Sequence, residues 1–196
     1  MQDKGVLEEC VAMRIAKATE AMQQCPELTP LLVKASSTIA NALLNDGKIL
    51  ALGTGSSTAL AQIFSAQLMN KFERDRPGLP VIALSADTVM MSSLDDQSTS
   101  GQYARQIKAL GKAADCLMVV SGIETRRNVI QAINSAHELE LPVIALTGCS
   151  NGEIGPLLNY RDIELRVDSD HPATVREQHL FLIHCLGELI DRQIFG

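Results

Sequence analysis

The sequence predicts an α/β protein: a three-layer α/β/α sandwich in which an N-terminal helical pair precedes a mostly parallel five-stranded sheet. Two observations carry this prediction. Short apolar runs alternate with helical segments, which is typical of parallel strands joined by right-handed crossovers. The first run also ends in a glycine turn that leads into a helix, as a strand-to-helix connection does. The four runs cover residues 49–52, 80–84, 116–120 and 143–146.

The N-terminal pair is predicted from apolar residues at helical spacing and from its boundary residues. Pro26 is expected to end the first helix. Thr29 is expected to cap the second helix, with Pro30 at its first helical position, and an Asn-Asp-Gly sequence at 45–47 to end it. Because both helices precede every strand, residues 1–46 either cover another subunit or pack on their own sheet. We expect the pair to serve in oligomerisation.

The four apolar runs have the length and composition of fully buried strands. A fifth strand, 163–167, alternates apolar and charged residues, so it is expected at an edge of the sheet. No internal repeat, linker or low-complexity tract interrupts the chain, so residues 1–196 are expected to form one domain. The remaining helices are expected over 58–73, 102–110, 125–139 and 173–194.

The composition argues against several classes of protein. The chain has 196 residues, a net charge of −6 and no cluster of Lys or Arg, which disfavours a nucleic-acid-binding surface. Its five cysteines form no CxxC pair, so neither a zinc site nor a disulfide framework is indicated. No apolar stretch is long enough to span a bilayer, and we expect a cytoplasmic protein.

The glycine turn Gly53-Thr54-Gly55-Ser56-Ser57 predicts a ligand class. Glycines let the backbone approach a ligand closely, and the free N–H groups at the start of a helix attract an anion. A phosphate is therefore the expected ligand. The alternative is that Ser57 and Thr58 only cap the helix.

Four further stretches identify the kind of fold: NALLNDGKIL (41–50), FERDRP (72–77), QIKALG (106–111) and IHCLGELIDR (183–192). With them, nearly the whole chain resembles a SIS (sugar isomerase) domain of the phosphoheptose isomerase group. The resemblance implies the SIS fold and leaves two functions open. One kind of member converts sedoheptulose 7-phosphate to a heptose phosphate. The other is the DnaA initiator-associating protein, a homotetramer that binds the replication initiator DnaA.

Three positions depart from the isomerases of this group. Where the isomerases have a metal-binding His, a catalytic Glu and a metal-binding Gln, this chain has Ile63, Gln67 and Arg176. Aldose–ketose isomerisation needs a base that can ionise, which the Gln67 amide cannot do near neutral pH. The permanently charged guanidinium of Arg176 would repel a metal cation. We therefore expect no catalytic residue, no metal and no cofactor.

Other positions match the group. Glu177 and His184 match isomerase positions and would be the catalytic pair in an enzyme, whereas otherwise His184 is a packed structural residue. In the second phosphate loop Ser121 is kept, but three other hydroxyls are lost and Glu124 adds a negative charge. Arg126 and Arg127 could offset that charge, so weak anion binding stays open. The expected sugar-phosphate-binding residues are Gly53, Gly55, Ser56, Ser57, Thr58 and Ser121.

Two further stretches each have two interpretations. At Ile194 and Phe195 the initiator-associating protein has a Leu-Phe pair implicated in binding DnaA, so these residues are the expected partner-binding pair. Alternatively, Phe195 only anchors the end of the helix. Asp95 and Asp96 form either a metal site, which no ligand spacing supports, or a solvated loop.

These residues favour a non-catalytic SIS-domain protein that binds DnaA as a homo-oligomer, with a vestigial or weak sugar-phosphate site. The alternative is a phosphoheptose isomerase acting on sedoheptulose 7-phosphate. A third hypothesis is a sensor that binds a sugar phosphate in the glycine turn and signals to another protein.

Overall fold

The computed structural model describes residues 4–84, 101–123, 126–149 and 152–196. Asp95, Asp96 and Glu124 lie outside the described residues. In the described part of the chain, no helix is long and apolar enough to cross a membrane. The elements in chain order are α1 (Lys4–Gln24), η1 (Cys25–Leu28), α2 (Thr29–Leu44), β1 (Ile49–Gly53), α3 (Ser57–Met69), β2 (Val81–Ala83), α5 (Gln102–Leu110), β3 (Cys116–Val120), α6 (Arg127–Glu138), β4 (Val143–Gly148), η3 (Gly155–Leu157), β5 (Ile163–Val167) and α7 (Pro172–Phe195).

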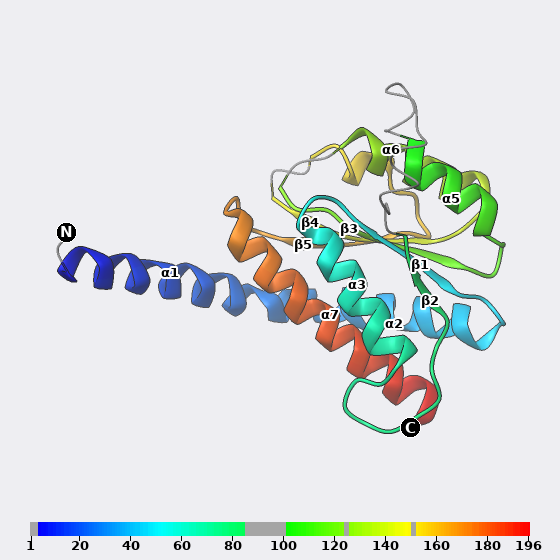
Figure 1. The fold of residues 1–196 in the computed structure, drawn as a ribbon, viewed down its shortest axis with the longest axis horizontal. Helices are drawn as coiled ribbons and strands as arrows, with labels where there is room; N and C mark the ends of the chain where they lie inside the picture. The colour runs from blue at the N-terminus through cyan, green and yellow to red at the C-terminus, as the bar shows by residue number, and fades with distance from the viewer. Residues whose placement is uncertain (1–3, 85–100, 124–125, 150–151) are drawn as a thin grey trace.

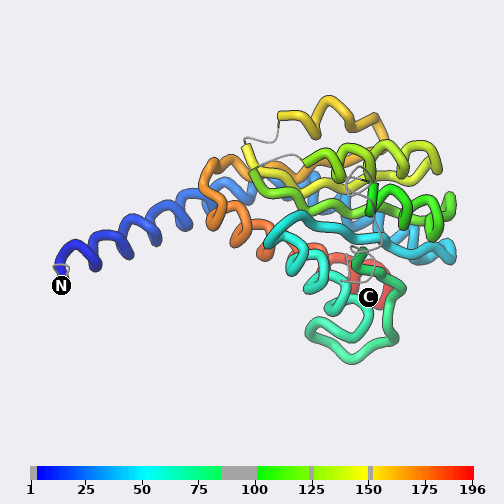
Figure 2. The backbone as a smooth tube through the Cα atoms, turned by 45° about the horizontal axis from the view of Figure 1, so that its top comes forward, coloured from blue at the N-terminus to red at the C-terminus, as the bar shows by residue number. Residues whose placement is uncertain are grey.

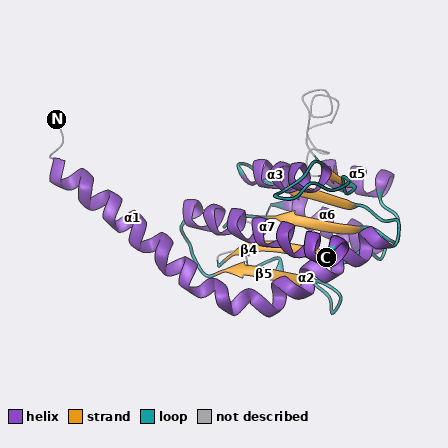
Figure 3. Ribbon diagram, turned by 90° about the horizontal axis from the view of Figure 1, so that it is seen from below, coloured by secondary structure: helices purple, strands orange, loops and turns teal. Residues whose placement is uncertain are grey.

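The predicted three-layer α/β architecture is confirmed. All four strand pairings are parallel, in the order β2-β1-β3-β4-β5. One face of the sheet carries α5 and α6, and the other carries α2, α3 and α7 (Figures 1 and 3). Side chains of β1 alternate between the two faces, since Ile49 and Ala51 pack in one core cluster and Leu50 and Leu52 in the other.

The strand order creates a switch point between β1 and β3. From β1 the chain passes first to β2 on one side and later to β3 on the other side. Ligands of open parallel sheets bind at the carboxyl ends of the strands beside such a point. The last paired residues there are Gly53 of β1 and Val120 of β3, so the loops that follow these two strands begin side by side.

Of the two edge strands, β5 was predicted at an edge and β2 was not. The alternating strand β5 lies at one edge, as expected, with Arg166 pointing to solvent. The run 80–84 is not a fully buried strand: it forms the three-residue strand β2, in which Ile82 is exposed. The reason is that β2 is the other edge of the sheet, which the apolar composition of the run does not reveal.

The N-terminal pair differs from its prediction in two respects. Thr29 is not the N-cap of α2, because η1 runs into α2 without leaving helical backbone and no side chain caps the junction. The two helices also separate. Leu32 and Ile39 of α2 are buried against their own sheet and α7, whereas most of α1 projects from the body of the molecule (Figure 2). The end of α2 is as predicted, with Asn45 as the C-cap.

Candidate functional site

The glycine turn joins β1 to α3 with a backbone that requires its glycines. Gly55 has φ +56°, in the left-handed region that side chains disfavour. A Cβ at Gly53 would collide with the backbone of Ser57, so the chain turns too tightly there for any other residue. The carbonyl of Gly53 accepts hydrogen bonds from Thr58 Oγ1 at 3.0 Å and from Tyr103 Oη at 2.8 Å. These bonds fix the turn at the end of β1.

The turn leaves hydrogen-bond donors for a ligand. Within the described residues, the backbone N–H groups of Gly55 and Ser56 have no acceptor. Ser56 is the N-cap residue of α3, but no side chain makes a capping hydrogen bond there. This arrangement of exposed amides at a helix start is suited to an anion.

An open pocket of about 230 Å³ lies over the turn, at the switch point of the sheet. Its walls come from three segments far apart in the sequence: the glycine turn, the loop after β3 and the start of α7. The lining residues are Thr54, Gly55, Ser56, Ser57, Gly122, Ile123, Arg126, Pro172 and Arg176.

Three of the predicted phosphate-binding residues line this pocket, namely Gly55, Ser56 and Ser57. The other three, Gly53, Thr58 and Ser121, are not among its lining residues. Gly53 is the last residue of β1, and Ser121 is completely buried with its N–H bonded to the carbonyl of Leu146.

Sequence reasoning missed the two guanidinium groups of the pocket. Arg176 had been considered only as a residue that repels a metal, and Arg126 only as compensation for a nearby acid. Both residues line the pocket, and the guanidinium group of neither forms an ion pair or hydrogen bond with any described residue. Glu177, the neighbour of Arg176, is held by Arg14 of α1, with 2.5 Å between Arg14 Nη2 and Glu177 Oε1. The Glu177 carboxylate is therefore paired with Arg14 and not with Arg176.

Tyr103, which bonds to the end of β1, is affected by the positive charge of Arg126. Burial raises the pKa of the Tyr103 hydroxyl, while hydrogen bonding and the positive charge of Arg126 oppose the rise. Tyr103 bonds to the carbonyl at the end of β1, so Arg126 acts electrostatically on the base of the turn. The sequence does contain an indication of a cation at this site: in the loop 121–126, which follows β3, Arg126 stands where the group has a hydroxyl.

The positions that carry isomerase chemistry in the group do not form such a site here. Ile63 has no donor atom and is 37% exposed on α3. Gln67 is buried against α7, where its Nε2 donates to the carbonyl of Ile183 at 3.3 Å and its Oε1 has no described partner. Together with the guanidinium of Arg176, these side chains do not fit a divalent metal. No group of three His, Cys, Asp or Glu in the described chain could hold a metal ion.

The alternative catalytic pair is also separated. Glu177 and His184 lie two turns apart on α7, about 10 Å along the helix axis. The ring of His184 stacks on Phe72 with 5.5 Å between centroids, and Glu177 pairs with Arg14. The two side chains therefore have separate partners.

The partner-binding pair predicted at the C-terminus is partly buried. Ile194 and Phe195 pack against the core at the end of α7. Arg74 and Arg76 approach the ring of Phe195, with 6.0 and 5.8 Å between guanidinium carbon and ring centroid. Phe195 thus anchors the helix end and still belongs to a half-exposed surface.

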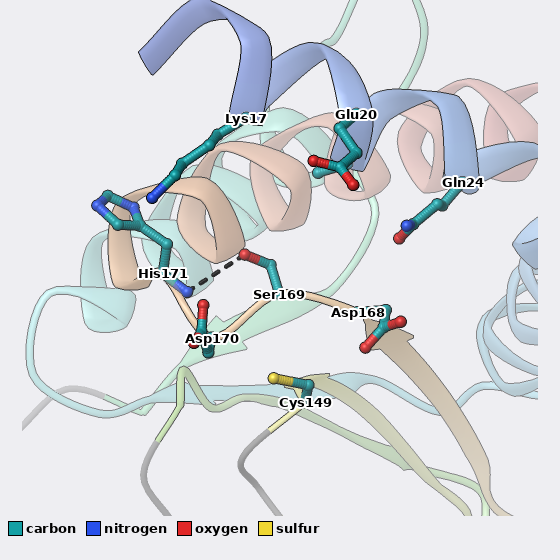
Figure 4. A pocket seen from close by; sticks show the side chains of 9 residues that line it. Lys17, Glu20, Gln24, Cys149, Asp168, Ser169, Asp170 and His171 are labelled. Carbon is teal, nitrogen blue, oxygen red and sulfur yellow. Dashed lines mark hydrogen bonds between the residues drawn. The ribbon is translucent and has the colours of Figure 1, made fainter. Parts of the chain in front are cut away.

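A second cavity, of about 350 Å³, lies between α1 and the segment that joins β5 to α7 (Figure 4). Figure 4 shows Lys17, Glu20 and Gln24 on one side and the loop of Asp168–His171 on the other. Three of its lining side chains are carboxylates, so it lacks the cationic character of the pocket over the glycine turn. No predicted site residue lies in it.

Fold and site together define a class: an α/β protein with an open pocket, lined by a glycine turn and two arginines, at the switch point of a parallel sheet. The chain matches the family model described as "SIS domain" over residues 15–148, and it belongs to the SIS domain family. It is 43% identical over 170 residues to a phosphoheptose isomerase of Chromohalobacter salexigens, covering 86% of each chain. It is 38% identical over 193 residues to the DnaA initiator-associating protein DiaA of Edwardsiella ictaluri, covering 98% and 95%.

A solved structure of a phosphoheptose isomerase from Francisella tularensis has the same fold, with a TM-score of 0.87 and 36% identity. The match covers 98% of this chain and 100% of that one. The chain is thus similar both to proteins named as isomerases and to a protein named for its association with DnaA.

Proposed function

We propose that this chain is a non-catalytic, cytoplasmic SIS-domain protein that binds DnaA as a homo-oligomer and promotes replication initiation. One observation carries the proposal: Ile63, Gln67 and Arg176 stand where isomerase chemistry would need a metal ligand, an ionisable base and a second metal ligand. Gln67 is committed to α7 through the carbonyl of Ile183, and Arg176 lines an anion pocket. The chain thus keeps the SIS fold but has replaced the residues that isomerase chemistry would need.

We place the DnaA-binding surface at the C-terminal end of α7. Aromatic and arginine side chains are the most frequent energetic centres of interfaces, and Phe195 lies here against Arg74 and Arg76. The adjoining hollow of about 350 Å³ is lined by residues including Phe72 and Arg192. A partner side chain fits beside the half-exposed Phe195 ring.

Immobilised wild-type chain is expected to retain purified DnaA, and Phe195→Ala to weaken that binding by roughly thirtyfold or more, as for an interface hot spot. The matched control is Tyr160→Ala, which removes an exposed aromatic side chain from the segment between η3 and β5 and should bind DnaA normally. Thermal unfolding of both variants checks that the fold is kept. Absence of DnaA binding by the wild-type chain would sink the proposal.

The identity to phosphoheptose isomerases favours a second candidate, an enzyme acting on sedoheptulose 7-phosphate. It would have to work through Glu177 and His184. Incubation of the wild-type chain with sedoheptulose 7-phosphate, with and without zinc, separates the two. We expect no product in either arm; turnover that His184→Ala abolishes would establish the enzyme instead.

We further propose that α1 joins copies of the chain, giving a homotetramer that presents several DnaA-binding surfaces at once. Its projecting part exposes apolar side chains that a lone molecule leaves in water, including Val6, Leu7, Val11, Met13 and Ile15. Ile15 is 61% exposed.

Ile15→Glu is expected to reduce the mass measured by light scattering, because a charge placed in an apolar interface has no partner. Its unfolding free energy per monomer should change little, since the side chain is exposed in the isolated chain. Gln23→Glu adds the same charge at an exposed position of α1 outside that apolar set and should keep the wild-type mass. A wild-type chain that is monomeric at micromolar concentration contradicts the proposal.

The pocket over the glycine turn is proposed to bind a sugar phosphate without converting it. The free amides of Gly55 and Ser56 and the start of α3 support this, as does the location at the switch point. A site that binds a sugar phosphate without converting it is either a sensor or a retained scaffold. The choice of compounds for binding experiments depends on the chemistry of its ligand.

A further inference from the structure

Three helix N-termini converge on the pocket over the glycine turn. Its lining includes Ser57, the first residue of α3, Arg126, the N-cap of α6, and Pro172, the first residue of α7. Each helix start carries about half a positive charge. None of the three helices has an acidic residue in its first turn, so no side chain of those turns neutralises the partial charges.

Two full positive charges add to these dipoles. Arg126 and Arg176 reach the pocket from different elements, the loop after β3 and α7. No carboxylate is among the described lining residues, and the acid next to Arg176, Glu177, is paired with Arg14. The accumulation is therefore local, in a chain whose net charge is −6.

Among the described residues, the positive charge at the pocket exceeds what one phosphate group can balance. Three helix starts and two guanidinium groups amount to about three and a half positive charges. A phosphate monoester carries about −1.5 to −2 at neutral pH. The turn, with its free amides and hydroxyls, is sufficient for one such group. Arg176, which comes from α7, is then left without a negative counterpart.

We infer that the pocket takes a small ligand with two anionic groups: a phosphate held by the turn and a second phosphate or carboxylate held by Arg176. The inference rests on the proposed sugar-phosphate site and specifies its ligand as a phosphorylated sugar acid or a sugar bisphosphate. An arginine binds either group through paired N–H donors. The volume of about 230 Å³, below the usual range for drug-sized molecules, suits a small ligand.

Isothermal titration calorimetry with matched pairs of compounds tests this. Glucose 6-phosphate is compared with 6-phosphogluconate, which differs by a carboxylate, and fructose 6-phosphate with fructose 1,6-bisphosphate, which differs by a second phosphate. The doubly anionic member of at least one pair is expected to bind about tenfold more tightly or better, as for an added charge-assisted hydrogen bond. The two pairs show whether a carboxylate or a phosphate is preferred.

Arg176→Gln is expected to reduce this preference to less than about threefold, because only the doubly anionic compounds have a second group for Arg176 to bind. The control variant Arg127→Gln removes the same charge from the start of α6, at a residue that does not line the pocket, and should keep the preference. Persistence of the full preference in Arg176→Gln overturns the inference.

The outcomes also separate this inference from the proposal on which it rests. Equal binding of the singly and doubly anionic compounds overturns the second anionic group and leaves a sugar-phosphate site. No binding of any of the four compounds at millimolar concentration overturns the sugar-phosphate site as well. Neither result bears on the DnaA pulldown, which measures a different surface.

Discussion

Arg76→Ala is expected to lower the free energy of unfolding by about 3–5 kcal/mol, the cost of leaving a buried charge without its partner. The side chains of Arg76 and Asp191 are 2% and 6% exposed, and Arg76 Nε lies 2.8 Å from Asp191 Oδ1. The same guanidinium donates to the carbonyls of Leu68 and Gln67, at 2.7 and 2.9 Å. It therefore ties the end of α3 to α7.

Urea unfolding followed by circular dichroism measures this effect. Arg192→Ala is the control, because Arg192 pairs with Glu188 on the exposed side of α7, and such pairs contribute at most about 1 kcal/mol. The double variant Arg76→Ala/Asp191→Ala should recover part of the loss, since it removes the unpaired carboxylate too. A loss below about 1 kcal/mol in Arg76→Ala would contradict this account of the α3–α7 junction.

Acidification is expected to destabilise the fold through His179, between about pH 6.5 and pH 4. His179 is completely buried, and burial lowers the pKa of its imidazole from 6.5 to about 4. Its Nε2 donates to the carbonyl of Thr147 at 3.1 Å, which places the neutral ring's lone pair on Nδ1. Nδ1 has no partner among the described residues, so a proton added there would be buried without an acceptor.

The sign follows from proton binding. Below pH 6.5 His179 binds a proton in the unfolded chain but stays neutral in the folded chain. The free energy of unfolding therefore falls with decreasing pH until the pKa of the folded state is reached. The pKa difference corresponds to about 3 kcal/mol, fully lost near pH 4. In His179→Gln, which keeps a donor for Thr147, unfolding curves measured across this range should show a loss smaller by about that amount. Equal pH dependence in both proteins would assign the effect to other groups.

Much of the fold follows from local sequence. Strands β3 and β5 and helix α5 have the predicted boundaries, because alternation and apolar runs depend on neighbouring residues only. The exposure of β2 could not be predicted, because the same apolar run would be buried in the middle of the sheet and only the strand order places it at the edge. The separation of α1 from α2 depends likewise on tertiary packing, which the helical spacing of apolar residues does not reveal.

The local sequence indicates the glycine turn of the pocket, but not the rest of the pocket lining. The glycine turn carries its own signal, since positive φ at Gly55 and the tight turn at Gly53 need glycine. Arg176 lies far along the chain and reaches the turn only because α7 begins beside the same edge of the sheet. From sequence alone it is the replacement of a metal ligand; in three dimensions it lines the same pocket as Arg126, Gly55 and Ser56.

The two edge strands of the sheet, β2 and β5, restrict how copies of this chain can associate. An open edge strand offers unpaired backbone groups to another sheet, and proteins limit this with short or charged edges. Here one edge, β2, is only three residues long, and the other, β5, bears Glu164 and Arg166 between its buried residues. Arg166 also bonds across to the carbonyl of Cys149. Continuous sheets running from molecule to molecule are therefore disfavoured, and copies are expected to meet helix against helix.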